Sequence, residues 1–365
     1  MLTLYRKYRP QRFEEVIGQE TVVRTITKEL ASGKTAHAYV FAGPRGIGKT
    51  TIARLFAKSL QCEEQKDGSY EPCGQCRQCQ AIASGSSLDV LEIDAASQTG
   101  VDNVRENIIQ GSRFAPQSGK WKVFIIDEAH MLSGAAFNAL LKTLEEPPSH
   151  AVFILATTEL HKIPATVVSR CQRFTFHRPS LDLLVERLVG ICGKEKVTVE
   201  EGVLRTIAYL ASGSTRDAES LLGQVLSLGL PKITVDDALL VLPKLAVGES
   251  LSLTEAMLSG NGTEAMKLLQ KLEADGESLE FFLRVLLDVW QELLVATFSL
   301  ALSKDGVLTK EEIQKFMDKK DVADVRVKLR QFVELGITAK GHLRMVDDPL
   351  LALTILVAKG LELAG

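Results

Sequence analysis

The 365-residue sequence predicts an α/β protein in which a parallel, doubly wound sheet precedes a small helical domain and an all-helical C-terminal part. Two observations support this prediction. Between residues 38 and 176, short apolar runs alternate with segments of helical periodicity, as is typical of parallel βαβ units. Beyond Leu181 the strand pattern stops, and amphipathic helical segments follow one another.

The composition is that of an ordinary soluble globular protein, with 45% hydrophobic and 24% charged residues. The formal net charge of -3 gives no overall attraction for nucleic acid, so any DNA contact needs a local basic surface. The N-terminus lacks the apolar core of a signal peptide, and six cysteines without such a signal favour a reducing compartment. The apolar stretch 281–302 carries charged residues and is not expected to span a membrane. We therefore expect a cytosolic protein without a membrane partner.

A glycine-rich loop follows the first predicted strand, residues 38–42. Its sequence, GPRGIGKT, fits the pattern G-x-x-x-x-G-K-[ST]. Ile52, Leu55 and Phe56 then recur at helical spacing. A strand, such a loop and a helix start together surround phosphate oxygens with backbone N–H groups. A glycine turn without a ligand is the alternative, but the context favours a nucleoside triphosphate site.

Within this site, Lys49 is expected to reach the β- and γ-phosphates, and the Thr50 hydroxyl is expected to hold Mg²⁺. The residues expected to surround the triphosphate are Gly43, Pro44, Arg45, Gly46, Ile47, Gly48, Lys49, Thr50 and Thr51.

A polar and basic segment, residues 5–19, precedes a predicted helix over residues 21–30. It is either a surface arm beside the first strand or, as in some ATPases with this loop, a segment that closes over the base.

Four cysteines lie within a short polar segment: Cys62, Cys73, Cys76 and Cys79. Their spacing suits tetrahedral thiolate coordination. The residues between them have no apolar period, so a closed structural zinc site would supply the stability that the segment lacks. An iron–sulfur cluster or unligated thiols are the alternatives. Cys171 and Cys192 lie far away in the sequence and are expected to be ordinary residues of their elements.

A second chemical centre is the segment KVFIIDEAH, residues 122–130. Its four apolar residues predict a strand buried on both faces, as in a parallel sheet. Asp127 and Glu128 follow at its carboxyl end, where open α/β sheets bind ligands. We expect Asp127 to hold Mg²⁺ and Glu128 to orient or deprotonate the attacking water.

Further predicted strands are residues 88–93, 151–156 and 173–176. Thr157 and Thr158 follow the second of these; a hydroxyl there could bond the γ-phosphate or the water, or both threonines could merely reflect β-propensity. Predicted helices cover residues 100–110 and 137–144. The polar face of the first contains Arg105, which is either solvated or positioned against a nucleic-acid backbone.

The helical part is predicted to contain segments 181–192, 199–211 and 216–228, with Ser214 or Thr215 as the cap of the third. Arg216, in that third helix, could form a surface ion pair or contact the γ-phosphate. Pro243 marks an expected boundary. The helices expected beyond it, which carry no recognisable chemistry and suit packing against copies or relatives of the chain, are 251–257, 263–272, 279–302, 310–335 and 349–363.

Several motifs in one order carry a resemblance to a known family. They are GPRGIGKTT, the four-cysteine insert, EIDAASQTGVDNVR, FIIDEAHMLS, NALLKTLEEPP, LATTELHKIPATVVSRCQRF and GSTRDAESLL. Over residues 1–230 the chain resembles the gamma/tau ATPase subunits of bacterial DNA polymerase III clamp loaders, which are AAA+ proteins. The resemblance implies an AAA+ domain over residues 1–178 with a zinc module at 62–79, a helical lid at 179–243 and an oligomerisation collar at 244–365.

The resemblance also implies roles. ATP is the nucleotide, with Mg²⁺ and Zn²⁺ as metals, and Asp127 and Glu128 are the Walker B pair. Thr157 matches sensor 1, Arg216 matches sensor 2, and Arg170 matches the arginine finger that reaches a neighbour's ATP, which makes hydrolysis depend on assembly. The segment 99–105 falls on the element that faces DNA.

The function that the resemblance implies is ATP-driven opening of a sliding clamp and its placement on primer–template DNA, within a hetero-oligomeric ring expected to have five subunits. Polymerase activity is expected by association only. A non-hydrolysing scaffold subunit is one alternative, but the intact loop and acidic pair disfavour it. An independent motor such as a helicase is another, and residues 245–365 show no sign of a second motor domain.

Overall fold

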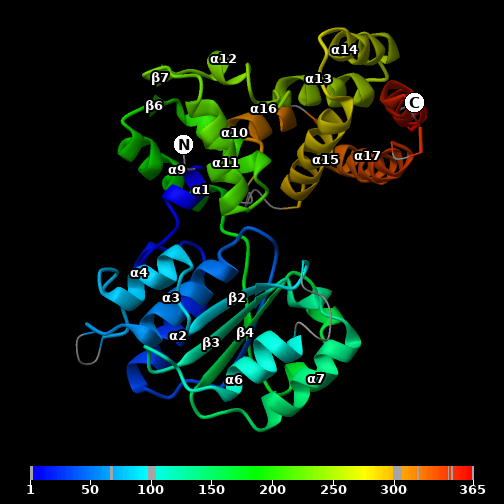
Figure 1. Ribbon diagram of the computed structural model, residues 1–365. Coiled ribbons are helices and arrows are strands. Elements are labelled where there is room, and N and C mark those ends of the chain that lie inside the picture. Colours follow the sequence, from blue (N-terminus) through cyan, green and yellow to red (C-terminus); the bar gives the residue numbers. More distant parts are fainter. Residues whose placement is uncertain are drawn as a thin grey trace. The chain divides into compact units, whose positions relative to one another are not determined.

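The structure is a computed structural model that describes residues 3–65, 69–97, 104–298, 306–318, 320–343, 345–346 and 348–363 (Figure 1). The chain divides into two compact units. The first comprises residues 1–196 and 210–227, and the second comprises residues 197–209 and 228–365.

The first unit is built on a five-stranded parallel sheet with the strand order β2-β3-β4-β1-β5. The strands are β1 (Ala38–Ala42), β2 (Val90–Asp94), β3 (Lys122–Asp127), β4 (Ala151–Thr157) and β5 (Gln172–Thr175). The predicted parallel α/β fold is therefore confirmed. Because Asp94 pairs with Asp127 and Ala42 pairs with Thr157, the polar residues that end the central strands meet at one edge of the sheet.

Helices cover both faces of this sheet (Figure 1). Side chains of β1 alternate between the two faces, as a strand requires: Tyr39 and Phe41 pack with Phe56 of α3, whereas Val40 packs with Leu140 of α7. The helices of this unit are α1 (Leu4–Lys7), α2 (Glu20–Ser32), α3 (Lys49–Gln61), α4 (Arg77–Ser84), α6 (Gly111–Arg113), α7 (Gly134–Glu145), α8 (Ala165–Val168), α9 (Leu181–Glu195) and α11 (Thr215–Leu226). Short 3-10 turns are η1 (Phe13–Glu15), η3 (Ala129–Met131) and η4 (Leu160–Lys162).

The helix predicted over residues 100–110 differs from expectation. Its described part, η2 (Val104–Gln110), is a π-helix, whose i→i+5 hydrogen bonds make a wider turn. A wider turn brings side chains four and five positions apart onto one face, and Val104 is followed at those positions by Ile108 and Ile109. Arg105 is exposed, as expected. Residues 99–101, which we expected to lie near DNA, are outside the described part of the chain.

The second unit is mainly helical, with Trp290, Phe282 and Phe332 in its core. Its elements are β6 (Thr198–Val199), α10 (Glu201–Leu210), β7 (Lys232–Ile233), α12 (Val235–Ala238), α13 (Val247–Leu258), α14 (Gly262–Ala274), α15 (Leu279–Ala296), α16 (Lys310–Met317), α17 (Val322–His342) and α18 (Pro349–Glu362). The indole Nε1 of Trp290 donates a hydrogen bond of 2.8 Å to the Thr254 hydroxyl, which satisfies a polar atom inside the core.

Two expectations for this unit were wrong in detail. The single helix predicted over residues 310–335 is two helices, because Asp321 accepts a hydrogen bond from the backbone N–H of Ala323 and so caps a new start. Strand pairing also continues beyond Leu181, since β6 and β7 pair in parallel over two residues each. Among the described residues, none of the helices combines the length and apolar character needed to cross a membrane.

Candidate nucleotide-binding site

The glycine-rich loop joins β1 to α3 in a conformation that its glycines make possible. Gly46 has a φ of +76°, and a Cβ there would lie 2.0 Å from the Ser214 hydroxyl oxygen. Gly43 packs as closely, since a Cβ would lie 2.5 Å from the carbonyl oxygen of Phe176. Neither position tolerates a side chain. The loop therefore lies directly against the N-terminus of α11 and the end of β5.

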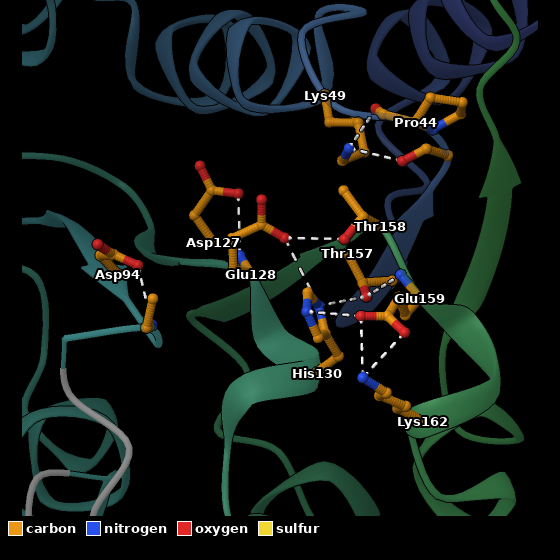
Figure 2. Close-up of polar contacts among 12 residues, drawn as sticks. Pro44, Lys49, Asp94, Asp127, Glu128, His130, Thr157, Thr158, Glu159 and Lys162 are labelled. Carbon is orange, nitrogen blue, oxygen red and sulfur yellow. Dashed lines mark hydrogen bonds and ion pairs between the residues drawn. The ribbon is translucent and has the colours of Figure 1, made fainter. Parts of the chain in front are cut away.

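Lys49 is buried at the start of α3 with its ammonium group turned back into the loop. Its Nζ donates hydrogen bonds of 2.7 and 2.6 Å to the carbonyl oxygens of Gly43 and Pro44 (Figure 2). Burial lowers the pKa of Lys49, and the carboxylates of Glu128 and Asp127 act in the opposite direction. The cation is thus held at the loop, facing the acidic end of β3.

The next residue, Thr50, contacts Asp127 directly. Its hydroxyl donates a hydrogen bond of 2.7 Å to Oδ2 of Asp127, and the backbone N–H of Glu128 donates one of 3.0 Å to Oδ1. Carboxylate and hydroxyl oxygens are hard ligands of the kind that Mg²⁺ prefers. The residues present therefore fit the metal that the sequence predicts.

Glu128 begins the turn after β3 in a strained backbone conformation. Its φ and ψ are 46° and 44°, in the left-handed region that costs energy for a residue with a side chain. Its Oε2 accepts a hydrogen bond of 3.3 Å from the Thr158 hydroxyl and lies 3.5 Å from Nδ1 of His130 (Figure 2). These contacts aim the carboxylate toward the space beside Lys49 rather than away from the sheet.

Thr157 is fully buried, and its hydroxyl contacts Glu159 and His130 rather than Lys49. Its Oγ1 accepts a hydrogen bond of 3.0 Å from the backbone N–H of Glu159 and lies 3.1 Å from Nδ1 of His130 (Figure 2). The threonine that touches Glu128 is therefore Thr158, whereas Thr157 reaches it through His130. The sensor role of Thr157 stays a prediction.

Sequence reasoning did not assign a role to His130. Its ring lies between two acids, with Nδ1 near Glu128 and Nε2 3.4 Å from Oε1 of Glu159, and 8% of its side chain is exposed. The side chain of Lys162 forms an ion pair of 2.9 Å with Glu159. The sequence feature that could have identified His130 is its position two residues after Glu128, at the end of a strand for which a catalytic role was already predicted.

The third helix predicted beyond the sheet, α11, brings Arg216 to the loop. Ser214 is its cap, because the Ser214 hydroxyl accepts a hydrogen bond from the backbone N–H of Asp217. The backbone N–H of Arg216 donates to the carbonyl oxygen of Gly46 at 3.2 Å. The Arg216 guanidinium lies over the Tyr5 ring, 4.8 Å from its centroid, in a cation–π contact.

These parts surround a cavity of about 460 Å³. The glycine-rich loop, the acidic ends of β2 and β3, residues 5–17, α9 and α11 all contribute to its wall. The lining residues outside the loop are Tyr5, Arg9, Pro10, Glu15, Val16, Ile17, Asp94, Ala96, Asp127, Glu128, Arg187, Thr215, Arg216 and Glu219. The wall thus combines apolar side chains such as Val16 and Ile17 with the charged groups of Lys49 and Asp127, which suits a ligand with an apolar body and a charged end.

An ion pair in this wall was not foreseen. Nε of Arg187 lies 3.0 Å from Oε1 of Glu219, and the guanidinium also donates to the carbonyl oxygen of Tyr8. Burial raises the pKa of Glu219, and Arg187 opposes that shift. The pair therefore links α9 and α11 to the N-terminal segment at Tyr8. Its partners lie 32 positions apart in the sequence, so no local sequence pattern predicts the pair.

The four cysteines of the insert converge as predicted. Their Sγ atoms all lie within 4.8 Å of one another, and Cys62, Cys76 and Cys79 are buried. Tetrahedral zinc bonds of 2.3 Å would bring the sulfurs to about 3.8 Å. The backbone N–H groups of Cys73 and Cys76 point at the sulfurs of Cys62 and Cys73, at 3.3 and 3.2 Å, as they do around bound thiolates. The cluster fits a structural metal.

Two family models match the chain: "DNA polymerase III, delta subunit" over residues 18–180 and "DNA polymerase III clamp loader subunit, ATPase lid domain" over residues 184–230. The gamma subunit of DNA polymerase III from Buchnera aphidicola subsp. Acyrthosiphon pisum is 42% identical over 80% of this chain and 77% of its own length. The chain belongs to the DNA polymerase III gamma/tau family.

Longer gamma/tau proteins are also similar. The tau subunit of Bacillus subtilis is 45% identical over 85% of this chain and 54% of its own length, and that of Escherichia coli is 41% identical over 81% and 46%. The chain therefore spans about half the length of these relatives. Among solved structures, the RuvB Holliday junction branch migration motor of Thermotoga maritima aligns at 18% identity with a TM-score of 0.47, over 85% of this chain and 90% of that chain.

In this gamma/tau chain, Arg170 lies apart from the cavity. It follows α8, where its guanidinium donates hydrogen bonds of 2.6 Å to the carbonyl oxygen of Thr166 and 2.5 Å to Oε1 of Glu145. Its side chain is one-third exposed. Arg170 is not among the described residues that line the cavity of its own chain, and its role as an arginine finger stays a prediction.

Proposed function

We propose that this chain is an ATP-hydrolysing motor subunit of a bacterial clamp loader, which uses ATP to open a sliding clamp and place it on primer–template DNA. The observation that carries the proposal is the convergence of Lys49, Thr50, Asp127 and Glu128 at one end of the sheet, in a chain of the gamma/tau family. A cavity of this size beside them has room for a nucleotide.

Within this proposal, phosphate oxygens replace the loop carbonyls as partners of Lys49. Thr50 and Asp127 hold Mg²⁺, which neutralises charge on the phosphates. Glu128, already aimed by Thr158, accepts the proton of the attacking water. Arg216 leaves the face of Tyr5 to contact the γ-phosphate, and Thr157 orients the same group.

Arg170 completes the site of a neighbouring subunit rather than its own. The support is its position away from the cavity, with its charge held by Glu145 on the surface. An arginine supplied in trans makes hydrolysis conditional on assembly and stabilises transition-state charge. The partners proposed are other clamp-loader subunits in a ring of five, the clamp and DNA, all in the cytoplasm.

The domain limits belong to the same proposal: an AAA+ domain over 1–178 with its zinc module, a lid over 179–243 and a collar over 244–365. The four cysteines hold structural zinc, which their closed geometry and the absence of an apolar period in the polar insert both favour.

The test uses two substitutions. Glu128→Gln should leave ATP affinity near the wild-type value and lower turnover about 100-fold or more, since it removes a general base. Arg170→Ala in one subunit of a mixed ring should abolish hydrolysis at the adjacent site while that subunit's own site still works. Normal turnover by Glu128→Gln, or full-rate hydrolysis by a DNA-free monomer, would contradict the proposal. ATP binding without any turnover in the assembled ring would favour the scaffold alternative, and strand separation would favour a helicase.

A further inference from the structure

The cavity wall contains a segment with little structure of its own. Residues 8–17, here called the arm, contribute Arg9, Pro10, Glu15, Val16 and Ile17 to the lining. Within the arm the regular structure is the three-residue turn η1. The hydrogen bonds within the arm are short-range, such as those from the N–H groups of Gln11 to Glu15 and of Val16 to Phe13, so its position against the rest of the chain depends on other elements. The contacts that hold the arm therefore determine the shape of this side of the cavity.

The cysteine module, residues 62–79, supplies two of these contacts, and both are made to Phe13 at the centre of the arm. Oε2 of Glu71 accepts a hydrogen bond of 3.2 Å from the backbone N–H of Phe13. The Tyr70 ring meets the Phe13 ring edge-on, with 6.2 Å between centroids. Phe13 is 1% exposed and belongs to the core cluster that contains Val22 and Ile26, so this point of the arm is fixed, while residues 9–10 and 15–17 line the cavity.

Helix α3 connects the module to the nucleotide loop. It begins at Lys49 and ends at Gln61, directly before Cys62. Near its end, the buried ammonium of Lys58 donates a hydrogen bond of 2.7 Å to Oε1 of Gln11 in the arm. The hydroxyl of Ser59 donates one of 2.6 Å to the carbonyl oxygen of Tyr70. A continuous path thus runs from the loop through α3 and the module to the arm and back to the cavity.

We propose that the metal-loaded cysteine module is a positioning element for the nucleotide site: through Tyr70 and Glu71 it holds the arm against the cavity, so that metal binding raises nucleotide affinity. This inference rests on the proposed function, because it takes the cavity to be the ATP site. It assigns the cysteine cluster a task beyond its own folding.

The physical basis of this proposal is that the cysteine module has little apolar core of its own. Its apolar cluster consists of the cysteine side chains themselves: Cys62, Cys76 and Cys79, with Cys73 packed against them. Without a metal these four thiols contribute little cohesion, so the backbone at Tyr70 and Glu71 keeps its hydrogen bond from Ser59 but loses the support of the cysteine cluster. Nucleotide binding would then have to order the arm as well, and the free energy that this ordering requires lowers the affinity for the nucleotide.

The experiment measures the dissociation constant of a fluorescent, non-hydrolysable ATP analogue on the full chain, together with bound zinc and hydrogen exchange of residues 8–17. Tyr70→Ala and Glu71→Ala should each raise the dissociation constant about 5- to 50-fold, speed exchange in the arm and leave the zinc content at one ion per chain. Glu71→Gln should restore affinity, because its amide oxygen can still accept from the Phe13 N–H. Glu64→Ala, an exposed acid of the same module, is the matched control and should bind like the wild type.

Chelation of the metal under reducing conditions should raise the dissociation constant as Glu71→Ala does, and the two changes together should add little. Tyr70 is 37% exposed, so its truncation leaves the core intact and keeps the test valid if the Glu71 variants fail to fold. Wild-type affinity in zinc-loaded Tyr70→Ala, or unchanged exchange in the arm after chelation, would overturn the inference. A wild-type chain that binds no ATP analogue would instead refute the proposed function.

Discussion

The Thr50 hydroxyl and the Asp127 carboxylate meet at 2.7 Å across 77 positions of the chain. The contact joins the first turn of α3 to the end of β3, and so links the glycine-rich loop to the acidic strand end. In the proposed function these two oxygens would be ligands of Mg²⁺, which would neutralise charge on the phosphates.

Thr50→Ala should raise the Mg²⁺ concentration that gives half-maximal ATPase activity, by about 10- to 100-fold. The substitution removes one of the two oxygens that the structure places together, while Lys49 still binds phosphate. A titration of ATPase activity against Mg²⁺ at saturating ATP measures the effect. Thr50→Ser, which keeps the hydroxyl, should behave like the wild type, and an equal Mg²⁺ requirement in all three proteins would exclude this metal contact.

His130 should affect turnover more than nucleotide binding. Its ring spans Glu128 and Glu159, so its removal leaves the Glu128 carboxylate with one fewer positioning contact. We expect His130→Ala to lower kcat about 10- to 100-fold with little change in the dissociation constant for ATP. His130→Asn should recover part of the rate, because its amide nitrogen takes the place of Nδ1.

His161 provides the control for this prediction. It also lies near Glu159, at 3.7 Å, but 76% of its side chain is exposed. His161→Asn should leave kcat unchanged. If His130→Ala instead weakens ATP binding and turnover in equal proportion, His130 supports the fold of the site rather than the position of Glu128.

Asp89 should make the stability of the first unit depend on acid pH. Its buried carboxylate accepts hydrogen bonds from the backbone N–H groups of Gln117, Ser118 and Gly119, at 2.8, 2.8 and 2.9 Å. Burial alone would raise the pKa of Asp89, but these three donors outweigh it, and the pKa lies below its ordinary value of 3.8. The folded state therefore binds fewer protons than the unfolded state in this range.

It follows that the stabilisation is complete above pH 3.8 and is lost as the pH falls through the lowered pKa of the folded state. Asp89→Asn should cost about 2 to 3 kcal/mol in the free energy of unfolding near pH 7 and should reduce the slope of stability with pH in acid. Denaturant unfolding between pH 2 and 7, with the exposed Asp275→Asn as control, tests both effects. The prediction is wrong if both variants show the wild-type slope.

The sequence predicted what is local and periodic. The loop before Lys49 and the acids at the end of β3 can be recognised from the residues that flank them. The alternation of strands and helices then predicted that both lie at one edge of a parallel sheet. The sequence could not predict that Thr158 contacts Glu128 or that Glu159 contacts His130, because those contacts depend on how β3 and β4 lie side by side. The contact of Glu71 with Phe13, 58 positions away, likewise has no local signal.

Prediction from local sequence patterns also failed where one pattern suits two different structures. Apolar residues at Val104, Ile108 and Ile109 suit an α-helix and a π-helix alike, so the pattern alone does not distinguish the two turns. The periodicity over 310–335 continues through a break that Asp321 creates by capping α17.

Two glycines of α17 should respond in opposite ways to the same substitution. A Cβ at Gly336 would lie 2.5 Å from Cδ2 of Leu287 and 3.1 Å from the Trp290 ring, so α17 packs on α15 through the bare backbone there. Gly336→Ala should therefore destabilise the second unit by about 1 to 3 kcal/mol through overpacking. A Cβ at Gly341 would meet nothing within 4 Å, so Gly341→Ala should stabilise the helix by about 0.5 to 1 kcal/mol. Thermal unfolding of both variants checks the pair; a gain in stability for Gly336→Ala would mean that α15 and α17 do not pack this closely.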